Sequence, residues 1–593
     1  MFVIGVHDGH NSSAALLKDG VIVAAIAEER FSRKKHHYGF PRLALSYLLN
    51  EYQIQPQDIL GVAMATKQLP PKYFQVRRNS SFTVADYWKE QKEYWYPLLY
   101  QNKRNKYLTI FDDKICPSFE SDYDQSLILD EDDVEGMWKA RVKLCSDFLN
   151  VDPSSIYCFD HHHCHAAYGY GACNKKHNDR YLVYSVDGGG DGFNGTVSIV
   201  EDGKVQEISR SSNCNIGRIY RYATLMLGMR PADHEFKVMG LAAYSDGKYG
   251  SYEYECYRET LDNDGLGFKY GVKPKDHFFY FKEKFEASRF DTIAYALQKR
   301  TEELLVEWTH QGHKETGISN FIFSGGVAQN IKASKKISEQ NYLESIFIPP
   351  GPGDESISIG AAILLTNKFH TGDQFHLSPS SKPLPNAYIG IKVPKTTPSN
   401  IDLQYKQVAA CHVTVEEVAK LLANGSIIGR FDTQCSEFGP RALGARSILA
   451  DPRNSSVIHK INKLVKVRDF WMPFAPSILE DDVDRYLLNP KKLSAPYMCL
   501  GFDTTPEAHI DLAGGVHPFD KTARAQIVYK EHNPSYYNLI QAFKALTGVG
   551  AILNTSFNVH GDAIVGTVED AINTLKKTGL DYVLIDDILV EET

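Results

Sequence analysis

The opening of the chain alternates short apolar runs with turn residues. An apolar run at residues 2–6 leads to Asp8-Gly9, and two further runs, 14–17 and 21–25, are joined by Lys18-Asp19-Gly20. A β-branched run that ends in Asp-Gly predicts a strand and a tight turn, and two runs joined by a short polar turn predict a hairpin. The chain is therefore expected to begin with a strand, an Asp-Gly turn and a β-hairpin.

The same pattern occurs again after Arg180. Residues 181–186 form an apolar run that ends at Asp187-Gly188, and the runs 196–200 and 204–208 flank a second short polar turn. We interpret the repetition as an internal duplication, with two unrelated hairpins as the alternative. Two such halves facing each other place both Asp-Gly turns at one cleft. That is the layout of actin-like (ASKHA) folds, in which Gly-rich turns hold phosphates through backbone N–H groups.

The rest of the pattern predicts an α/β protein with two domains. Helices are expected at 42–49, 292–311 and 357–365, and strands at 321–323, 427–431 and 551–557. A Pro- and Ser-rich stretch at 377–399 is the clearest linker. It separates a first domain, 1–376, from a second domain, 400–593, and residues 66–140 form an insertion in the first domain.

Composition narrows the class of protein. The chain has 593 residues, a net charge of −8 and 43% apolar residues, which is ordinary for a globular protein and argues against broad nucleic-acid binding. The N-terminus looks like a first strand instead of a signal peptide, and no apolar run approaches the length of a membrane-spanning helix. The 10 cysteines form no Cys-x-x-Cys pair and are expected to be reduced thiols of a cytoplasmic protein.

Four residues in the first domain predict a metal site. His161 and His165 are spaced i and i+4 on an expected helix, so both imidazoles project from one face. Asp187 ends an expected strand, and Asp354 follows a rigid Pro-Gly turn, where it can supply the fourth ligand. The alternative is an ordinary pair of histidines. Nitrogen and oxygen ligands suit iron, zinc or manganese.

Two further groups of residues predict anion binding. Glycines that follow two expected strands can cradle a nucleotide, with a polar residue beside them; they are Gly188, Gly189, Gly325, Gly326 and Asn330. In the second domain, basic residues gather near Gly-Pro turns in an otherwise acidic protein, which indicates a polyanion pocket, with a solvated basic face as the alternative. Polar residues after the strand at 551–557 could contact a base or a phosphate.

The insertion at 66–140 is aromatic in its first half and acidic in its second. A helical lid or a subunit contact is one interpretation, and it leaves a homodimer open. The other interpretation of the insertion is an acceptor-binding surface. In that case the acids favour a cationic acceptor; they are Asp112, Asp113, Asp122 and Asp124.

Together the motifs resemble the NodU/CmcH family of O-carbamoyltransferases over nearly the whole chain. The stretches that carry the resemblance are His10 with Ser12-Ser13-Ala14, Glu28-Glu29-Arg30-Phe31, His161-x-x-x-His165, Asp187-Gly188-Gly189, Lys237-Val238-Met239-Gly240, Ser324-Gly325-Gly326-Val327, Gly353-Asp354-Glu355, Glu437-Phe438-Gly439-Pro440-Arg441, Pro473-Phe474-Ala475-Pro476 and Asn554-Thr555-Ser556-Phe557-Asn558. The resemblance implies a first domain similar to the threonylcarbamoyl-transferase (TsaD-type) fold and a second domain similar to YrdC. It also implies carbamoyl phosphate, ATP with Mg²⁺, and an iron ion in the first domain.

The resemblance further implies a two-step reaction in natural-product biosynthesis. Carbamoyl adenylate forms in the second domain and then passes its carbamoyl group to a hydroxyl of a small acceptor in the first, where His10 and Lys35 would lie near the carbamoyl group. The phosphate-binding residues of the second domain would be Arg441, Lys466, Arg468, Arg524, Asn554, Ser556, Asn558 and His560.

The sequence departs from the family pattern at Met472 and His560, where relatives usually carry a longer basic residue. Two other classes of protein stay open. An actin-like small-molecule kinase fits the duplicated turns but leaves the histidine pair unexplained. A nucleotide-gated binding protein without enzymatic activity needs no carbamoyl donor.

Overall fold

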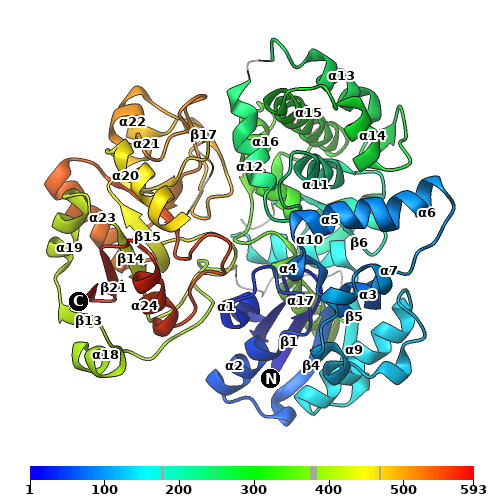
Figure 1. Cartoon of the computed structure of the whole chain (residues 1–593), viewed down its shortest axis with the longest axis horizontal. Coiled ribbons are helices and arrows are strands. Elements are labelled where there is room, and N and C mark those ends of the chain that lie inside the picture. The colour runs from blue at the N-terminus through cyan, green and yellow to red at the C-terminus, as the bar shows by residue number, and fades with distance from the viewer. Residues whose placement is uncertain (175–178, 246, 374–382, 467–468, 470) are drawn as a thin grey trace. The chain divides into compact units, whose positions relative to one another are not determined.

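The computed structural model describes residues 1–174, 179–245, 247–373, 383–466, 469 and 471–593, without the side chains of residues 120, 121, 455, 464 and 466. The chain divides into two compact units, Met1–Leu384 and Pro385–Thr593 (Figure 1). The expected linker, 377–399, starts outside the described residues. Its later part packs into the C-terminal unit, where Ile389 and Ile391 are buried.

The N-terminal unit contains two five-stranded sheets of the same topology. The first sheet has the order β3(Val21–Ala27), β2(Ser13–Lys18), β1(Phe2–His7), β4(Ile59–Ala65), β5(Ile156–Phe159). The second has the order β8(Lys204–Ser211), β7(Phe193–Glu201), β6(Tyr181–Gly190), β11(Asn320–Ser324), β12(Ser345–Phe347). In each sheet the three strands of the hairpin half are antiparallel and the other two run parallel to the first strand. The duplication expected from the sequence is therefore present.

Two helices lie between these sheets. Helix α17(Ile357–Thr371) packs against β1, β2 and β4, whereas α10(His161–Ala172) packs against β6 and β11, and the two helices pack against each other (Figure 1). Their backbones approach closely at Gly360, where a Cβ atom would lie 1.8 Å from the carbonyl oxygen of Cys164. Any larger residue there would push the helices apart. This contact sets the distance between the segments that begin the two helices.

One expected boundary was wrong. The sequence indicated that β6 ends before Asp187, followed by a tight glycine turn, but β6 continues through Gly190 and the turn falls at Asp191-Gly192. The strand can continue because Gly190 pairs again with Phe193 after an irregularity in the register. Asp187 therefore projects from an extended strand.

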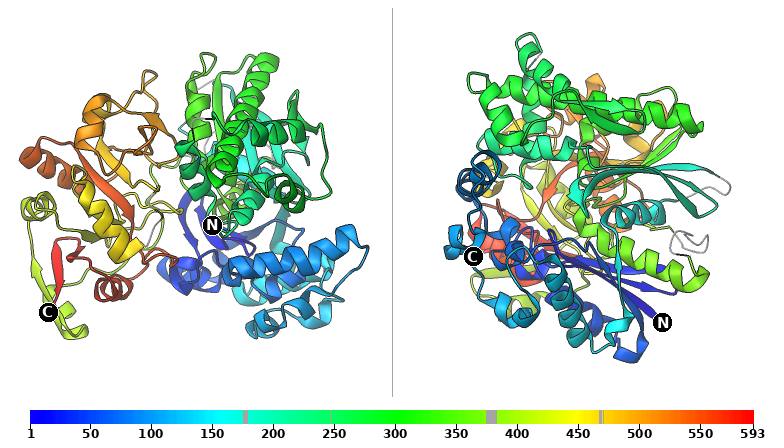
Figure 2. Two further views of the ribbon diagram at one scale, coloured as in Figure 1. Left: turned by 45° about the horizontal axis from the view of Figure 1, so that its top comes forward. Right: turned by 90° about the vertical axis from the view of Figure 1, so that its right-hand side faces the viewer.

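The insertion is a set of short helices, drawn in blue shades on one side of the N-terminal unit in Figures 1 and 2. They are α3(Pro71–Gln75), α4(Arg78–Ser81), α5(Val84–Lys89), the π-helical turn Glu90–Trp95, α6(Tyr96–Tyr100), α7(Tyr107–Ile110), α8(Ser118–Asp122) and α9(Val134–Leu149). Tyr87 and Tyr94 belong to a buried cluster that also includes Leu225 and Phe278 from outside the insertion. The rings of this cluster are therefore core residues, whereas Tyr96 and Tyr100 of the same stretch are exposed.

The acidic half of the insertion also has structural partners. Asp122 pairs with Arg42 at 2.9 Å, and the side chain of Asp124 accepts a hydrogen bond from the Ser126 backbone N–H at 3.1 Å. The side chain of Asp112 accepts one from the Asp113 N–H at 2.8 Å. Asp122 is thus part of an ion pair and Asp124 caps a short helix, so these two carboxylates have structural partners.

A buried ion pair ties the insertion to the first sheet. Arg141, on α9, and Asp8, at the end of β1, are both fully buried, and Arg141 Nη2 lies 2.6 Å from Asp8 Oδ1. Arg141 also donates to the carbonyl oxygen of Thr66 at 2.9 Å. The pair therefore joins α9 to the strand ends near the cleft between the sheets.

We expect Arg141→Met to destabilise the N-terminal unit by about 3–5 kcal/mol, because it leaves the Asp8 carboxylate buried without a counter-charge. Urea unfolding followed by tryptophan fluorescence reports on this unit, since four of the five tryptophans lie in it. The matched control is Lys143→Met on the same helix. Its pair with Asp147 is exposed, so this variant should unfold at nearly the same urea concentration as the wild type. Equal midpoints for the two variants would contradict the prediction.

The C-terminal unit is built on one eight-stranded sheet. Its order is β13(Val408–His412), β22(Ile588–Glu592), β21(Tyr582–Ile585), β14(Ile428–Phe431), β15(Arg446–Ala450), β20(Ala551–Ser556), β16(Ala475–Leu479), β19(Gln526–Val528). A hydrophobic core between this sheet and helices α20(Ser455–Ile461) and α24(Val568–Lys577) includes Phe431, Ile448 and Leu575. In neither unit do the described residues include a helix long and apolar enough to cross a bilayer.

Candidate metal centre and phosphate-binding edge

The four residues expected to bind a metal lie together in the N-terminal unit. One ligand atom of each of His161, His165, Asp187 and Asp354 falls within 4.8 Å of the others. The two histidines come from the first turns of α10, Asp187 from β6, and Asp354 from the turn that precedes α17. The close packing of α10 on α17 and β6 brings the three segments to one point.

The distances within this group match a metal polyhedron. His161 Nε2 and His165 Nε2 are 3.2 Å apart, and His165 Nε2 is 3.6 Å from both Asp187 Oδ2 and Asp354 Oδ1. Ligands about 2.1 Å from a central ion at tetrahedral angles lie about 3.4 Å from one another. Asp354 Oδ1 is buried and has no hydrogen-bond partner among the residues that the structure describes. A cation is the group that these atoms can share.

The electrostatics of the centre agree with that interpretation. Burial, with the charge of Asp187 nearby, raises the pKa of Asp354 to about 7. Burial lowers the pKa of His165 to about 4, so its imidazole is neutral and its ring nitrogens are available as ligands at neutral pH. Although burial opposes it, the neighbouring histidines lower the pKa of Asp187. A bound cation would relieve the repulsion between two buried carboxylates.

Thr66 and Asp191 orient the first histidine. Thr66 Oγ1 lies 2.9 Å from His161 Nδ1, and the Asp191 carboxylate accepts a hydrogen bond from the His161 backbone N–H at 3.0 Å. Such partners hold a metal-binding imidazole in one tautomer and orientation. Sequence reasoning missed both residues. Thr66 carries no motif, and Asp191 was noted only as part of a glycine-rich stretch.

A second cluster, around His10, lies next to the metal centre. His10 and His36 have ring centroids 5.3 Å apart, and Asp233 accepts from Lys35 Nζ at 2.6 Å and lies 3.0 Å from His36 Nε2. Asn11 links the two clusters, because its amide lies 2.8 Å from His36 Nδ1 and donates to Glu355, beside Asp354, at 3.4 Å. Burial holds the pKa of His10 well below its usual value, so the ring is neutral.

Sequence reasoning singled out His10 and Lys35 but missed the residues that join them. Asp233 lies four residues before the quoted stretch Lys237-Val238-Met239-Gly240, and Asn11 stands between His10 and Ser12. Both are short polar residues next to a motif, so a wider reading of each motif would have included them. Their partners are about 200 and 340 residues away along the chain, which no local pattern reveals.

The glycine turns of the N-terminal unit surround Asp187. The backbone N–H groups of Gly188 and Gly326 donate to the two oxygens of its carboxylate, each at 2.5 Å. A Cβ on Gly325 would lie 2.2 Å from the carbonyl oxygen of Val186, whereas one on Gly188 would meet nothing within 4 Å. Glycine is therefore required at position 325, where the chain after β11 passes close to β6. A side chain at position 188 would meet no neighbouring atom.

Asn330 has a structural role that the sequence did not indicate. Its side chain caps α16(Ile331–Ser338) by accepting from the Ala333 N–H at 3.1 Å, and it exchanges two amide hydrogen bonds of 3.0 Å with Gln298. These contacts orient the turn that carries Gly325 and Gly326. A direct contact between the Asn330 amide and a nucleoside would compete with them.

The expected phosphate-binding residues of the C-terminal unit converge by topology. Strands β15, β16 and β19 run in one direction and β20 runs in the opposite direction. The segments before β15 and β19 and the segment after β20 therefore lie at one edge of the sheet. These segments carry Arg441, Arg524 and Ser556, and both arginines are partly exposed. Arg468 and the side chain of Lys466 lie outside the described residues.

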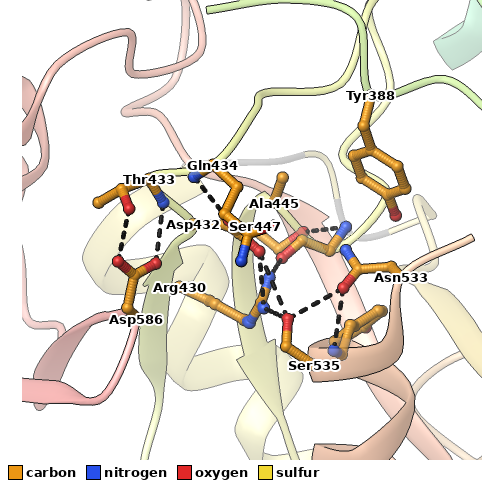
Figure 3. A network of polar contacts seen from close by, with 12 residues as sticks. Tyr388, Arg430, Asp432, Thr433, Gln434, Ala445, Ser447, Asn533, Ser535 and Asp586 are labelled. Carbon is orange, nitrogen blue, oxygen red and sulfur yellow. Dashed lines mark hydrogen bonds and ion pairs between the residues drawn. The ribbon is translucent and has the colours of Figure 1, made fainter. Parts of the chain in front are cut away.

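A buried network holds the loop that carries Arg441. Arg430 donates to the Gly444 carbonyl oxygen and to Ser535 Oγ, the latter at 2.7 Å, and pairs with Asp432 at 3.1 Å (Figure 3). The Gly444 N–H donates in turn to Ser447 Oγ at 2.9 Å. These hydrogen bonds thus hold the loop between β14 and β15 in place before any ligand binds.

The polar residues of β20 and of the segment after it form hydrogen bonds with other residues of the protein. Asn554 is buried, and its amide donates to the Ala442 carbonyl oxygen at 3.1 Å and to Ser477 Oγ at 3.0 Å. Ser556 Oγ donates to Asn558 Oδ1 at 2.7 Å, and the Asn558 amide donates to the Asp562 carbonyl oxygen at 2.6 Å. Asn554 therefore positions the loop of Arg441, and the exposed His560 follows at the edge of the sheet.

Comparison with known proteins gives the class of this enzyme. Models of the carbamoyltransferase N-terminus and C-terminus match residues 3–363 and 419–592. The chain therefore belongs to the carbamoyltransferase family and is an enzyme of carbamoyl transfer. The resemblance inferred from the motifs is confirmed at this level.

Relatives that span most of the chain include nodulation proteins. Nodulation protein NolNO of Sinorhizobium fredii is 28% identical over 98% of this chain and 79% of its own length. An uncharacterized protein of Methanocaldococcus jannaschii is 30% identical over 100% of this chain and 99% of its own length. Among solved structures, component A of an Acidaminococcus fermentans (R)-2-hydroxyglutaryl-CoA dehydratase covers 61% of this chain and 96% of its own with a TM-score of 0.29.

Proposed function

We propose that this carbamoyltransferase works in two steps, one in each unit. Carbamoyl adenylate forms from carbamoyl phosphate and ATP at the edge of the C-terminal sheet. The carbamoyl group then passes to a hydroxyl of a small-molecule acceptor beside the metal centre of the N-terminal unit. The observation that carries the proposal is the separation of the two clusters: the metal-type residues belong to one compact unit, and Arg441 and Arg524 belong to the other.

In the first step, water converts carbamoyl phosphate to carbamate and phosphate. A carbamate oxygen then attacks the α-phosphorus of ATP, and pyrophosphate leaves. Charge gathers on the phosphoryl oxygens, and Mg²⁺ accompanies ATP. Guanidinium groups suit this charge because they donate two parallel hydrogen bonds to phosphate oxygens. Arg441 and Arg524, at one edge of the sheet, are the residues that we assign to it.

The metal centre fits a divalent ion with a mixed nitrogen and oxygen ligand set. His161, His165, Asp187 and Asp354 would hold it, and the buried Oδ1 of Asp354 supports the assignment. We favour Fe²⁺ from the family resemblance, and Zn²⁺ or Mn²⁺ would also accept these ligands. When bound, such an ion polarises a carbonyl or anchors a phosphate.

The protein's own groups perform the transfer chemistry. His10 is neutral, and its buried Nδ1 lacks a hydrogen-bond partner among the described residues, so the ring can take the proton of the acceptor hydroxyl as the hydroxyl attacks the carbamoyl carbon. The Lys35 ammonium, 2.6 Å from Asp233, can donate to the carbamoyl oxygen as negative charge develops on it. AMP leaves, and we assign the glycine segment of β6, with Gly188, and the turn after β11, with Gly326, to the side of its phosphate.

The two matching sheets of the N-terminal unit support an actin-like (ASKHA) fold for it. A YrdC-like C-terminal unit and a role in a natural-product pathway follow from the family resemblance alone, and the proposed cytoplasmic location follows from the unpaired pattern of the cysteines in the sequence. The kinase alternative shares the duplicated sheets but does not account for the four clustered ligands or for the carbamoyltransferase family.

The products separate these functions. We expect the enzyme, supplied with carbamoyl phosphate and Mg-ATP, to release phosphate and pyrophosphate, and to release AMP once an acceptor hydroxyl or water takes the carbamoyl group, measured by anion-exchange chromatography. A kinase would release ADP. Formation of ADP, or AMP formation that is independent of carbamoyl phosphate, would contradict the proposal.

A further inference from the structure

Two arginines border the His10 cluster and have no part in the proposed chemistry. Arg221 lies on α11(Ile216–Met226), and Arg230 lies in the loop that follows it. Arg230 donates to the backbone oxygen of Asn79 at 2.5 Å, and the guanidinium of Arg221 is 5.9 Å from the centre of the Tyr87 ring. Tyr87 in turn donates to the Asn79 side chain at 3.2 Å. Both arginines thus contact residues of α4 or α5.

A short chain of contacts joins these arginines to His10. Arg230 Nη1 is 3.6 Å from Asp233 Oδ2, the carboxylate that also contacts His36, and the His36 ring is next to that of His10. After burial, which is the largest cause, the charges of His36, Arg221 and Arg230 are among those that lower the pKa of His10. The two guanidinium groups therefore lie close to His10.

Two buried guanidinium donors beside this cluster are unused. Arg221 Nη2 and Arg230 Nε are buried and have no hydrogen-bond partner within the part of the chain that the structure describes. A buried guanidinium N–H group without an acceptor is costly, so a ligand atom is expected to complete the arrangement. The ligand atom that best suits a guanidinium is an anionic oxygen.

The local charge is positive enough to hold an anion. The cluster contains three permanent cations, Lys35, Arg221 and Arg230. It contains three carboxylates: Glu29 accepts from the His36 backbone N–H at 2.8 Å, and Asp233 is shared between Lys35, His36 and Arg230. The third, Glu235, has a pKa raised by burial and accepts from the Ala232 N–H at 2.6 Å. The positive charge that remains is centred on Arg221.

We propose that Arg221 and Arg230 bind an anionic group of the hydroxyl acceptor, so that the substrate is an acidic small molecule. The group would be a carboxylate, a phosphate or a sulfate. This inference rests on the proposed carbamoyl transfer and names the class of its acceptor. A planar guanidinium pair would hold the acceptor through its anionic group and leave the hydroxyl free to meet His10.

The phosphate of carbamoyl adenylate is the other source of an anionic oxygen. A different arginine, Arg218, contacts the glycine segment expected to hold that nucleotide. Arg218 Nε donates to the Gly188 carbonyl oxygen at 2.9 Å, and its guanidinium lies beside Gly189. Arg221 is one helical turn further along α11. We therefore assign Arg218 to the nucleotide side and Arg221 to the acceptor side.

Sulfate binding tests the proposal without a known acceptor. Sodium sulfate is titrated calorimetrically into the full-length, metal-loaded protein, with AMP and pyrophosphate in excess to fill the other phosphate sites. We expect Arg221→Gln and Arg230→Gln each to raise the sulfate Kd about tenfold, the effect of one charge-assisted hydrogen bond. Arg258→Gln, which removes an exposed arginine paired with Glu255, is the control and should leave the Kd unchanged.

Crystals of the protein soaked in sodium selenate with AMP give the position of the anion. Anomalous scattering should place selenium between the two guanidinium groups while AMP remains bound. Absence of that peak, an equal sulfate Kd in all variants, or an AMP phosphate in its place would each overturn the proposal. Release of pyrophosphate from carbamoyl phosphate and ATP by the same preparation is measured in parallel. Its absence would refute the two-step reaction and not the anion site.

Discussion

Replacing His165 by alanine should remove the metal ion and reduce carbamoyl transfer at least about 100-fold, because loss of one ligand is expected to exceed the 10- to 100-fold effect of losing an outer-shell partner. Elemental analysis should find about one ion per wild-type chain and far less in His165→Ala and in the double variant with His161→Ala. The remaining ligands would leave Asp354 and Asp187 as two buried carboxylates close together, which further weakens binding.

The same helix offers a matched control. His163 lies between the two ligands, but its ring turns away and contacts Glu207 at 3.0 Å. His163→Ala should therefore keep the metal. Thr66→Val should lower metal affinity by about 10- to 100-fold, because it removes the partner of His161 Nδ1. Equal metal content in the wild type and in the double variant would rule out a metal ion at these residues.

The second large effect is expected at the other unit. Arg441→Ala should abolish the release of pyrophosphate that depends on carbamoyl phosphate, because it removes the charge that holds the phosphates at the sheet edge. His165→Ala should leave this release largely intact while ending transfer to an acceptor. Pyrophosphate is measured with a coupled phosphate assay, and the transferred group with labelled carbamoyl phosphate.

Arg453→Ala is the control for this experiment. Arg453 follows β15 at the opposite end from Arg441, and its side chain pairs with Asp451 at 2.6 Å. Its loss should leave pyrophosphate release unchanged. If Arg441→Ala and His165→Ala each ended both activities, a single shared site would replace the two-step proposal.

Much of the N-terminal architecture could be predicted from the sequence. Each strand–turn–hairpin unit is stabilised by contacts between neighbours in the chain. Its hydrophobic pattern therefore predicts the structure that it adopts in the fold. The pair His161 and His165 was predictable for the same reason, since i and i+4 positions on a helix share a face whatever surrounds them. The chemistry of the residue types then indicated Asp187 and Asp354 as further ligands.

Other properties depend on segments that are far apart in the sequence. Asn330 and Asn554 were expected to contact ligands, but the structure uses their amides to hold loops, because their partners Gln298 and Ser477 come from distant elements. Tyr87 and Tyr94 of the insertion are buried in a cluster to which α11 and a helix near residue 280 contribute Leu225 and Phe278. A polar or aromatic residue carries no local sign of whether a distant neighbour will satisfy or bury it.

The sequence by itself determined the family, the duplicated sheets and the four residues proposed as metal ligands, because these rest on local spacing and residue chemistry. Only the tertiary structure decided which remaining polar groups are free. It joined Lys35, His36 and Asp233 beside His10, and it left donors of Arg221 and Arg230 unused among the described residues. The physical reason is that hydrogen-bond satisfaction and burial are properties of the whole packed unit, in which each group competes for partners brought together from different parts of the chain.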